Sequence, residues 1–297
     1  MFFVAPRAPR GTISGMQTLG ALYGSTVAVL LAGTGVLHLV PCLGAAGRRC
    51  AEALCRAPGV DLALGFFTIA PVVVGAVLAG WSGVGIALAA EVTALLVWIA
   101  LHELVHPQAR RGPRIQRYVS RLVGRWRNHT AIWITALVVP IFWLVRFAEI
   151  LLYPPLVWLL GFPRYRHADW VNVSRHKFSG LVGYDLIWCL YCDWMTGVWS
   201  LGTEMLRNVE SFWCPIRFSS DKKCENCQVD FPDIDGGWVS ADGTMVEVVE
   251  LIERQYADGN RGWFAHPGRR TDEPVPARPR HDDQPRRAQA VGNPPGR

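Results

Sequence analysis

The pattern His-Glu-x-x-His begins at His102, at the end of a long apolar stretch. A spacing of four residues places His102 and His106 on one face of a helix, where both imidazoles can bind the same metal ion. Glu103 lies beside them and could activate a water bound to that metal, so it is the candidate catalytic residue. Such a site needs a third protein ligand, for which Glu149 and His129 are the candidates.

These five residues resemble the zinc-binding signature of metallopeptidases, some of which are embedded in membranes. The resemblance implies a metal-dependent hydrolase with Glu103 as its base. The same residues also resemble the first histidine box of membrane desaturases and hydroxylases, which implies oxidation at a di-iron site. The adjacent paired histidines of that family's further boxes are missing from this chain, so hydrolysis is the preferred reaction.

The motif also has a simpler interpretation. Polar residues are expected where an apolar helix meets an arginine-rich loop, and His102, Glu103 and His106 would then only mark a membrane interface. Glu91 favours a functional site, because an ionisable group inside a membrane span is costly and usually faces a partner or a cavity. It precedes His102 by 11 residues and falls on the same helix face. Both interpretations stay open.

Cysteines provide a second candidate site. Cys-x-x-Cys pairs occur at Cys189 and Cys192 and at Cys224 and Cys227, with Cys214 between the pairs. Thiolates in this arrangement suit tetrahedral zinc, which is the expected metal, or iron, which is the alternative. A structural metal is expected rather than a redox centre, because a small domain needs such a staple.

The ligand set of this cysteine site is open. One possibility uses both pairs. The other combines Cys214 with the pair Cys224 and Cys227 and takes its fourth ligand from Cys192 or His176. If the segment lay outside the cytoplasm, disulfides would be expected instead of a metal.

The elements that carry these sites are predicted to be membrane helices. The chain has 297 residues, of which 51% are hydrophobic and only 18% are charged, whereas a soluble domain averages about 25% charged residues. The net charge of +6 is explained by arginines that face anionic lipid head groups. A nucleic-acid partner is therefore not expected.

A helix needs roughly 20 apolar residues to cross a bilayer. The N-terminal arm at 1–16 is followed by 17–105, which is predicted to hold three spans at 18–43, 61–79 and 84–104. The second and third spans are joined by a tight glycine-containing turn at 80–83.

The orientation of the chain across the membrane is predicted from the positions of its arginines. The basic loop at 106–129 contains seven arginines and is predicted to be cytoplasmic, which places the N-terminus outside the cell. Residues 130–162 are too long for one straight span and too short for two. Their middle contains Arg146 and Glu149, which are three residues apart and able to pair on one helix face. Basic residues flank them on both sides, so a membrane hairpin broken at Pro154-Pro155 is favoured over a single span followed by a surface helix.

The rest of the chain is predicted to be a Cys-rich and Trp-rich cytoplasmic segment at 163–256 and a disordered tail at 257–297. The predicted fold class is all-α: a polytopic helical protein of the cell membrane with a small Cys-stapled cytoplasmic segment. The C-terminus is expected in the cytoplasm.

Three functions fit this reading. The first is a metal-dependent hydrolase that uses His-Glu-x-x-His. The second is a non-catalytic metal-binding membrane subunit that docks a partner complex. The third is a membrane oxidoreductase with Cys-ligated iron.

Overall fold

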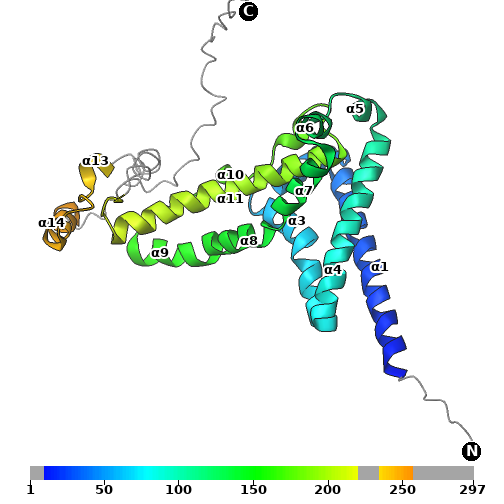
Figure 1. The fold of residues 1–297 in the computed structure, drawn as a ribbon, viewed down its shortest axis with the longest axis horizontal. Helices are drawn as coiled ribbons and strands as arrows, with labels where there is room; N and C mark the ends of the chain where they lie inside the picture. The colour runs from blue at the N-terminus through cyan, green and yellow to red at the C-terminus, as the bar shows by residue number, and fades with distance from the viewer. Residues whose placement is uncertain (1–9, 220–233, 257–297) are drawn as a thin grey trace, which may run out of the picture. The chain divides into compact units, whose positions relative to one another are not determined.

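The structure, a computed structural model, describes residues 10–219 and 234–256 (Figure 1). Every regular element in these ranges is a helix, and the β contacts there are two isolated bridges, Arg56 with Asn172 and Ile216 with Val239. The all-α prediction is therefore confirmed for this part of the chain. The predicted disordered tail at 257–297 lies outside the described residues.

The chain divides into two compact units. One comprises Met1–Pro154 and Val171–Leu206, and the other comprises Pro155–Trp170 and Arg207–Arg297. The His-Glu-x-x-His motif belongs to the first unit, and Cys214 belongs to the second.

The first unit begins with long apolar helices. They are α1 (Arg10–Leu39), α2 (Gly44–Leu54), α3 (Gly59–Thr68) and α4 (Ala70–Val105), with a 3-10 turn at Val40–Cys42. α1 lies along α4 (Figure 1). Between these two helices the hydroxyls of Tyr23 and Thr93 are 2.8 Å apart, and Trp98 Nε1 donates to His38 Nε2 at 3.2 Å.

α4 is a helical hairpin. Its helical geometry is interrupted at Ala79 and at Gly80, whose φ of +59° lies in the left-handed region that favours glycine. Gly75 and Gly83 pack against each other across this turn, and a Cβ on either would overlap the carbonyl oxygen of the other. The tight turn expected at 80–83 is thus present, one residue earlier than expected.

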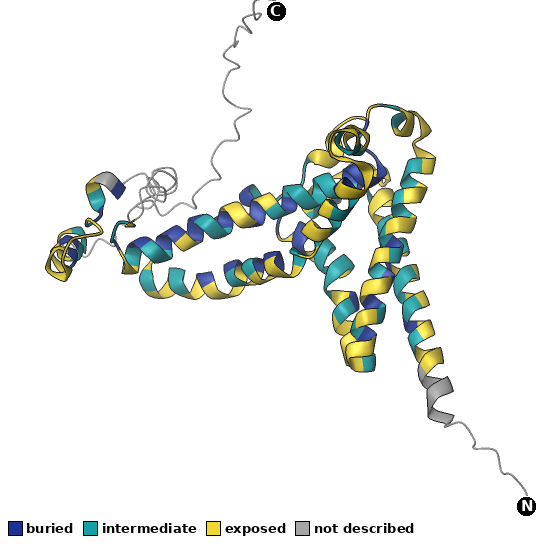
Figure 2. Ribbon diagram, in the orientation of Figure 1, coloured by how far each residue is buried: buried dark blue, intermediate teal, exposed yellow. Residues whose placement is uncertain are grey.

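Three helical stretches in the described residues are long and apolar enough to cross a membrane: Met16–Cys42, Gly59–Val105 and Arg125–Leu160. The hairpin lies within the second stretch. Large apolar side chains are exposed along these helices, where exposed residues are yellow in Figure 2, and examples are Val77 and Leu104.

The basic loop and the apolar stretch after it are also helical. They form α5 (Pro107–Arg111), α6 (Ile115–Val123), α7 (Arg125–Ala136), α8 (Val139–Phe147), a π-helical turn (Ala148–Leu152) and α9 (Tyr153–Leu160). The helix does not end at Pro154-Pro155. Helical residues precede and follow both prolines, and the wider π turn lies directly before them, where it accommodates the missing N–H groups.

The remaining helices are α10 (His167–Trp170), a 3-10 turn (Arg175–Lys177), α11 (Gly183–Trp213), α13 (Ile234–Gly237) and α14 (Met245–Tyr256). α14 starts with a capping box: Thr244 N–H donates to Glu247 Oε2 at 2.6 Å, and Glu247 N–H donates to Thr244 Oγ1 at 3.4 Å. Leu251 of α14 packs with Ile234 and Trp238 in a small core of the second unit.

Candidate functional site

The His-Glu-x-x-His motif lies at the C-terminal end of α4. His102 and Glu103 belong to the last turns of the helix, and His106 is its C-cap residue. The motif faces the start of α11, because Gly183 and Tyr184 donate backbone hydrogen bonds to it. The site is thus formed by segments that lie 81 residues apart in the sequence.

The carboxylate of Glu103 is held by arginine and by backbone. Arg114 Nη2 donates to Glu103 Oε1 at 2.8 Å, and the Tyr184 N–H donates to the same oxygen at 3.4 Å. Arg110 Nε lies 3.8 Å from Glu103 Oε2. Charge-assisted hydrogen bonds of this kind fix a carboxylate in position. The carboxylate expected to act as a base therefore joins two helices.

Arg114 completes this connection from the other side. Its Nε donates to Asp185 Oδ2 at 2.6 Å, and its Nη2 also donates to the carbonyl oxygen of Val182 at 3.2 Å. Burial alone would lower the pKa of the Arg114 guanidinium, but the hydrogen bonds to Glu103 and Asp185 outweigh burial and raise this pKa above its ordinary value. We call Glu103, Arg114 and Asp185 the Arg114 clasp.

Gly183 allows the close approach of α11 to α4. Its φ is +52°, and a Cβ at this position would overlap the side chain of Glu103. Only glycine combines this backbone conformation with the space that the carboxylate needs. Gly183 is thus a local requirement of the Arg114 clasp.

The two histidines of the motif stack on each other, with ring centroids 4.4 Å apart. The Gly183 N–H donates to His102 Nδ1 at 3.1 Å, so the proton of the neutral His102 ring is on Nε2. His106 Nδ1 lies 2.9 Å from the His102 carbonyl oxygen, which accepts its proton and leaves the lone pair on His106 Nε2. In this arrangement His106 offers a ring lone pair to a metal, whereas His102 does not.

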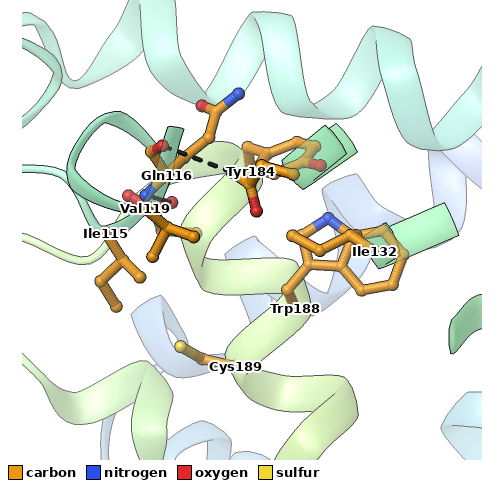
Figure 3. A pocket seen from close by; sticks show the side chains of 9 residues that line it. Ile115, Gln116, Val119, Ile132, Tyr184, Trp188 and Cys189 are labelled. Carbon is orange, nitrogen blue, oxygen red and sulfur yellow. Dashed lines mark hydrogen bonds between the residues drawn. The ribbon is translucent and has the colours of Figure 1, made fainter. Parts of the chain in front are cut away.

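His129, one candidate for the third ligand, is engaged elsewhere. Its Nδ1 lies 3.2 Å from the Tyr184 hydroxyl, and its Nε2 lies 3.0 Å from Gln116 Nε2. Its two partners, Gln116 and Tyr184, are among the residues that line a small cavity of about 80 Å³, whose lining is shown in Figure 3. Ligand sites are typically about 300–1,000 Å³. The cavity has room for a few water molecules and none for a substrate.

Glu149, the other candidate third ligand, belongs to a second ionic cluster. Arg146 donates through Nε and Nη2 to both oxygens of Asp61, at 3.0 and 2.6 Å, and through Nη1 to Glu149 Oε2 at 2.6 Å. Trp194 Nε1 donates to Asp61 Oδ1 at 3.3 Å. Arg146 is only 1% exposed. We call Asp61, Arg146 and Glu149 the Arg146 clasp.

The structure does not bring Glu149 and the two histidines together. Among the described residues there is no group of three or more His, Cys, Asp or Glu side chains placed to hold a metal ion. The spacing of Arg146 and Glu149 predicted their pairing, which is present. Sequence reasoning missed Asp61 and Asp185, although a carboxylate at the edge of an apolar helix is a signal for such a partner.

The described cysteines of the second candidate site are free thiols. Cys189 and Cys192 lie half-buried in α11, and Cys214 is exposed just after that helix. Burial raises the pKa of the Cys189 thiol, and this effect outweighs the opposing charge of Arg175. Cys224 and Cys227 lie outside the described residues.

His176, a candidate fourth ligand of the cysteine site, lies beside a different thiol. Its Nε2 is 3.8 Å from Cys55 Sγ, which follows α2. Burial and the neighbouring charge of Lys177 lower the pKa of His176, so its imidazole is neutral near neutral pH. A neutral imidazole can bind either a thiol proton or a metal.

The described part of the candidate site therefore consists of two arginine–carboxylate clasps with a stacked histidine pair beside the first. Comparisons of the chain with protein-family models, with curated proteins and with solved structures find no match.

Proposed function

We propose that the chain is a non-catalytic, metal-binding subunit of the cell membrane whose cytoplasmic segment docks a protein partner. The observation that carries the non-catalytic part of this proposal is the environment of Glu103. Its carboxylate is bound by Arg114 and by the Tyr184 N–H, and so it holds α4 to α11. A catalytic base must instead reach a metal-bound water in the site. These contacts suit a structural role for the motif.

Membrane embedding is supported by the apolar stretches Met16–Cys42, Gly59–Val105 and Arg125–Leu160. Their exposed side chains are largely apolar, and a bilayer would cover them. The arginines of 106–129 favour a cytoplasmic position for this loop, which puts the N-terminus outside the cell, and a C-terminus inside the cell requires that 130–162 return to the cytoplasm. Within these helices Arg146 then pairs with the carboxylates of Asp61 and Glu149, so that no unpaired charge of the Arg146 clasp faces the lipid.

The metal of this proposal is zinc, held by cysteine thiolates in the segment that includes Cys214, Cys224 and Cys227. Thiols persist in the cytoplasm, where a cysteine cluster more often binds metal than forms disulfides. Cys189, Cys192 or His176 would supply further ligands. Such a metal would stabilise the docking segment. Iron at the same ligands is the alternative, and it would give the subunit a redox role.

A hydrolase remains the second candidate, because one observation favours it. His106 Nε2 keeps a lone pair for a metal while its Nδ1 is bound to the His102 carbonyl oxygen. Catalysis would then require Arg114 to release Glu103 and His102 to change its tautomer.

Metal content separates these functions. Detergent-purified wild-type protein would be compared by inductively coupled plasma mass spectrometry with His102→Ala/His106→Ala and with Cys224→Ser/Cys227→Ser. We expect bound zinc to be lost in the cysteine variant and retained in the histidine variant. Loss of metal in the histidine variant alone would instead favour the hydrolase. Iron in place of zinc would favour the oxidoreductase and would be visible as an absorption band.

A further inference from the structure

The most exposed apolar side chains of the basic loop lie on α6 and at the start of α7. On α6, Ile115, Tyr118 and Leu122 are exposed, and Trp126 of α7 is 80% exposed. The spacing of three and four residues places the first three on one face of the helix. A soluble surface rarely gathers large apolar side chains in this way without a partner.

The other side of α6 packs against α7, and this contact determines which residues of α6 stay exposed. Asn128 Nδ2 donates to Ser120 Oγ at 3.0 Å and to the Gln116 carbonyl oxygen at 3.4 Å. Gln116, Val119 and Ser120 are half-buried there. α6 is therefore held in one rotational setting that leaves Ile115, Tyr118 and Leu122 exposed.

The charges beside this face all have the same sign. Arg114 is buried and bound to Glu103 and Asp185. The other arginines in and around α6 are exposed, and these are Arg111, Arg117, Arg121, Arg125 and Arg127. The Arg121 guanidinium lies over the Tyr118 ring, 5.8 Å from its centroid. The sequence contains no Asp or Glu between Glu103 and Glu149. The face therefore combines apolar side chains with arginines that form no ion pair within the described part of the chain.

We propose that α6 is an interfacial helix that binds anionic phospholipid, with Ile115, Tyr118 and Leu122 among the acyl chains and Arg117 and Arg121 on the phosphates. A basic amphipathic helix has this preference, because apolar burial and attraction to anionic head groups add. This inference rests on the membrane embedding proposed above.

Chain connectivity favours a lipid surface over other occupants. α6 starts at Ile115, soon after the apolar stretch Gly59–Val105 ends, and Arg125 begins the next apolar stretch immediately after α6. Both ends of the helix are thus tethered where membrane spans would reach the head groups. Because the neighbouring spans already hold α6 at head-group depth, the helix loses no translational freedom when it binds lipid.

The proposal is tested on the full-length protein in detergent, by titration with phosphatidylglycerol or phosphatidylcholine and native mass spectrometry. We expect the wild type to prefer phosphatidylglycerol and the variant Arg117→Gln/Arg121→Gln to lose affinity for it, on the order of 5-fold for each arginine removed. The matched control is Arg48→Gln/Arg49→Gln, which removes the same charge from exposed positions of α2. This control should lose clearly less affinity than the α6 variant.

Equal affinity of the wild type for the two lipids would overturn the proposal and would leave the α6 face to an acidic protein partner. Equal losses in the α6 variant and in the α2 control would also overturn it, since binding would then follow net charge alone. Membrane embedding is measured separately by resistance to extraction with alkaline carbonate. Wild type and both variants should share this resistance, so a failure of embedding is distinguished from a failure of lipid binding.

Discussion

Arginine determines the local structure at both clasps. Arg114 and Arg146 each bind two carboxylates, and the fixed fork of guanidinium donors is suited to that task. The sequence predicted the pairing of Arg146 with Glu149, because three residues separate them on one helix. It could not predict Asp61, which is 85 residues from Arg146, since no local spacing encodes a contact between distant helices.

The cysteine thiols provide a prediction at the same level. Burial raises the pKa of Cys189 above its ordinary value of 9.0. Only the thiolate reacts with iodoacetamide, so the alkylation rate of Cys189 should stay low near neutral pH and should reach its midpoint above pH 9.0. Mass spectrometry of the Cys189 peptide after timed labelling gives this profile. A midpoint below that value would contradict the burial of the thiol.

Among the helices, the α4 hairpin shows how far glycine spacing is informative. The turn was predictable from its glycines, because Gly80 needs a left-handed conformation that other residues rarely adopt. The contact of α11 with α4 was not predictable, because it depends on Gly183 lying against Glu103. The motif chemistry inferred from the sequence therefore missed the backbone donors of Gly183 and Tyr184, which bind His102 and Glu103.

The hairpin predicts opposite effects for two neighbouring glycines. Gly83→Ala should destabilise the protein by about 1–3 kcal/mol, because its Cβ would overlap the backbone of Gly75. Gly85→Ala meets no atom within 4 Å and should be stabilising by up to about 1 kcal/mol, since alanine is the better helix former. Thermal unfolding in detergent, followed by tryptophan fluorescence, measures both. Equal shifts in the two variants would be inconsistent with the observed packing.

The junction of α4 and α11 offers a second matched pair. Gly183 and Gly180 both have positive φ, +52° and +83°, but only at Gly183 would a Cβ meet Glu103. Either alanine substitution costs about 1–2 kcal/mol of backbone strain. Gly183→Ala should therefore lower the unfolding temperature more than Gly180→Ala, and the same fluorescence assay compares them. A larger shift for Gly180→Ala would argue against the clasp.

For the molecule as a whole, the sequence predicted helix class and apolar stretches well, because both follow from composition and length. The all-α class is confirmed, and three apolar stretches have the length of membrane spans. The candidate metal site was less predictable. A motif fixes which side chains share a helix face, but it does not show that Glu149 pairs with Arg146 in its own helical stretch or that His129 contacts Tyr184 of α11.

The proposed orientation of the whole chain is open to a direct test. In a variant without other cysteines, Ala8→Cys should react with a membrane-impermeant maleimide on intact cells, whereas Ala290→Cys should react only after permeabilisation. The physical reason is the arginine-rich loop 106–129, because loops rich in arginine favour the cytoplasmic side. Labelling of the C-terminal reporter on intact cells would show that the C-terminus lies outside the cell and would contradict the proposed orientation.

The central claim is that Glu103 holds the fold together through Arg114. It is tested most directly by a double-mutant cycle on unfolding free energy in detergent, with Glu103→Gln, Arg114→Gln and the double variant. We predict that each single variant is destabilised and that their effects are coupled by at least about 1 kcal/mol, because the pair is in direct contact. Additive effects, with Glu103→Gln as stable as the wild type, would contradict the account and would restore Glu103 as a candidate catalytic base.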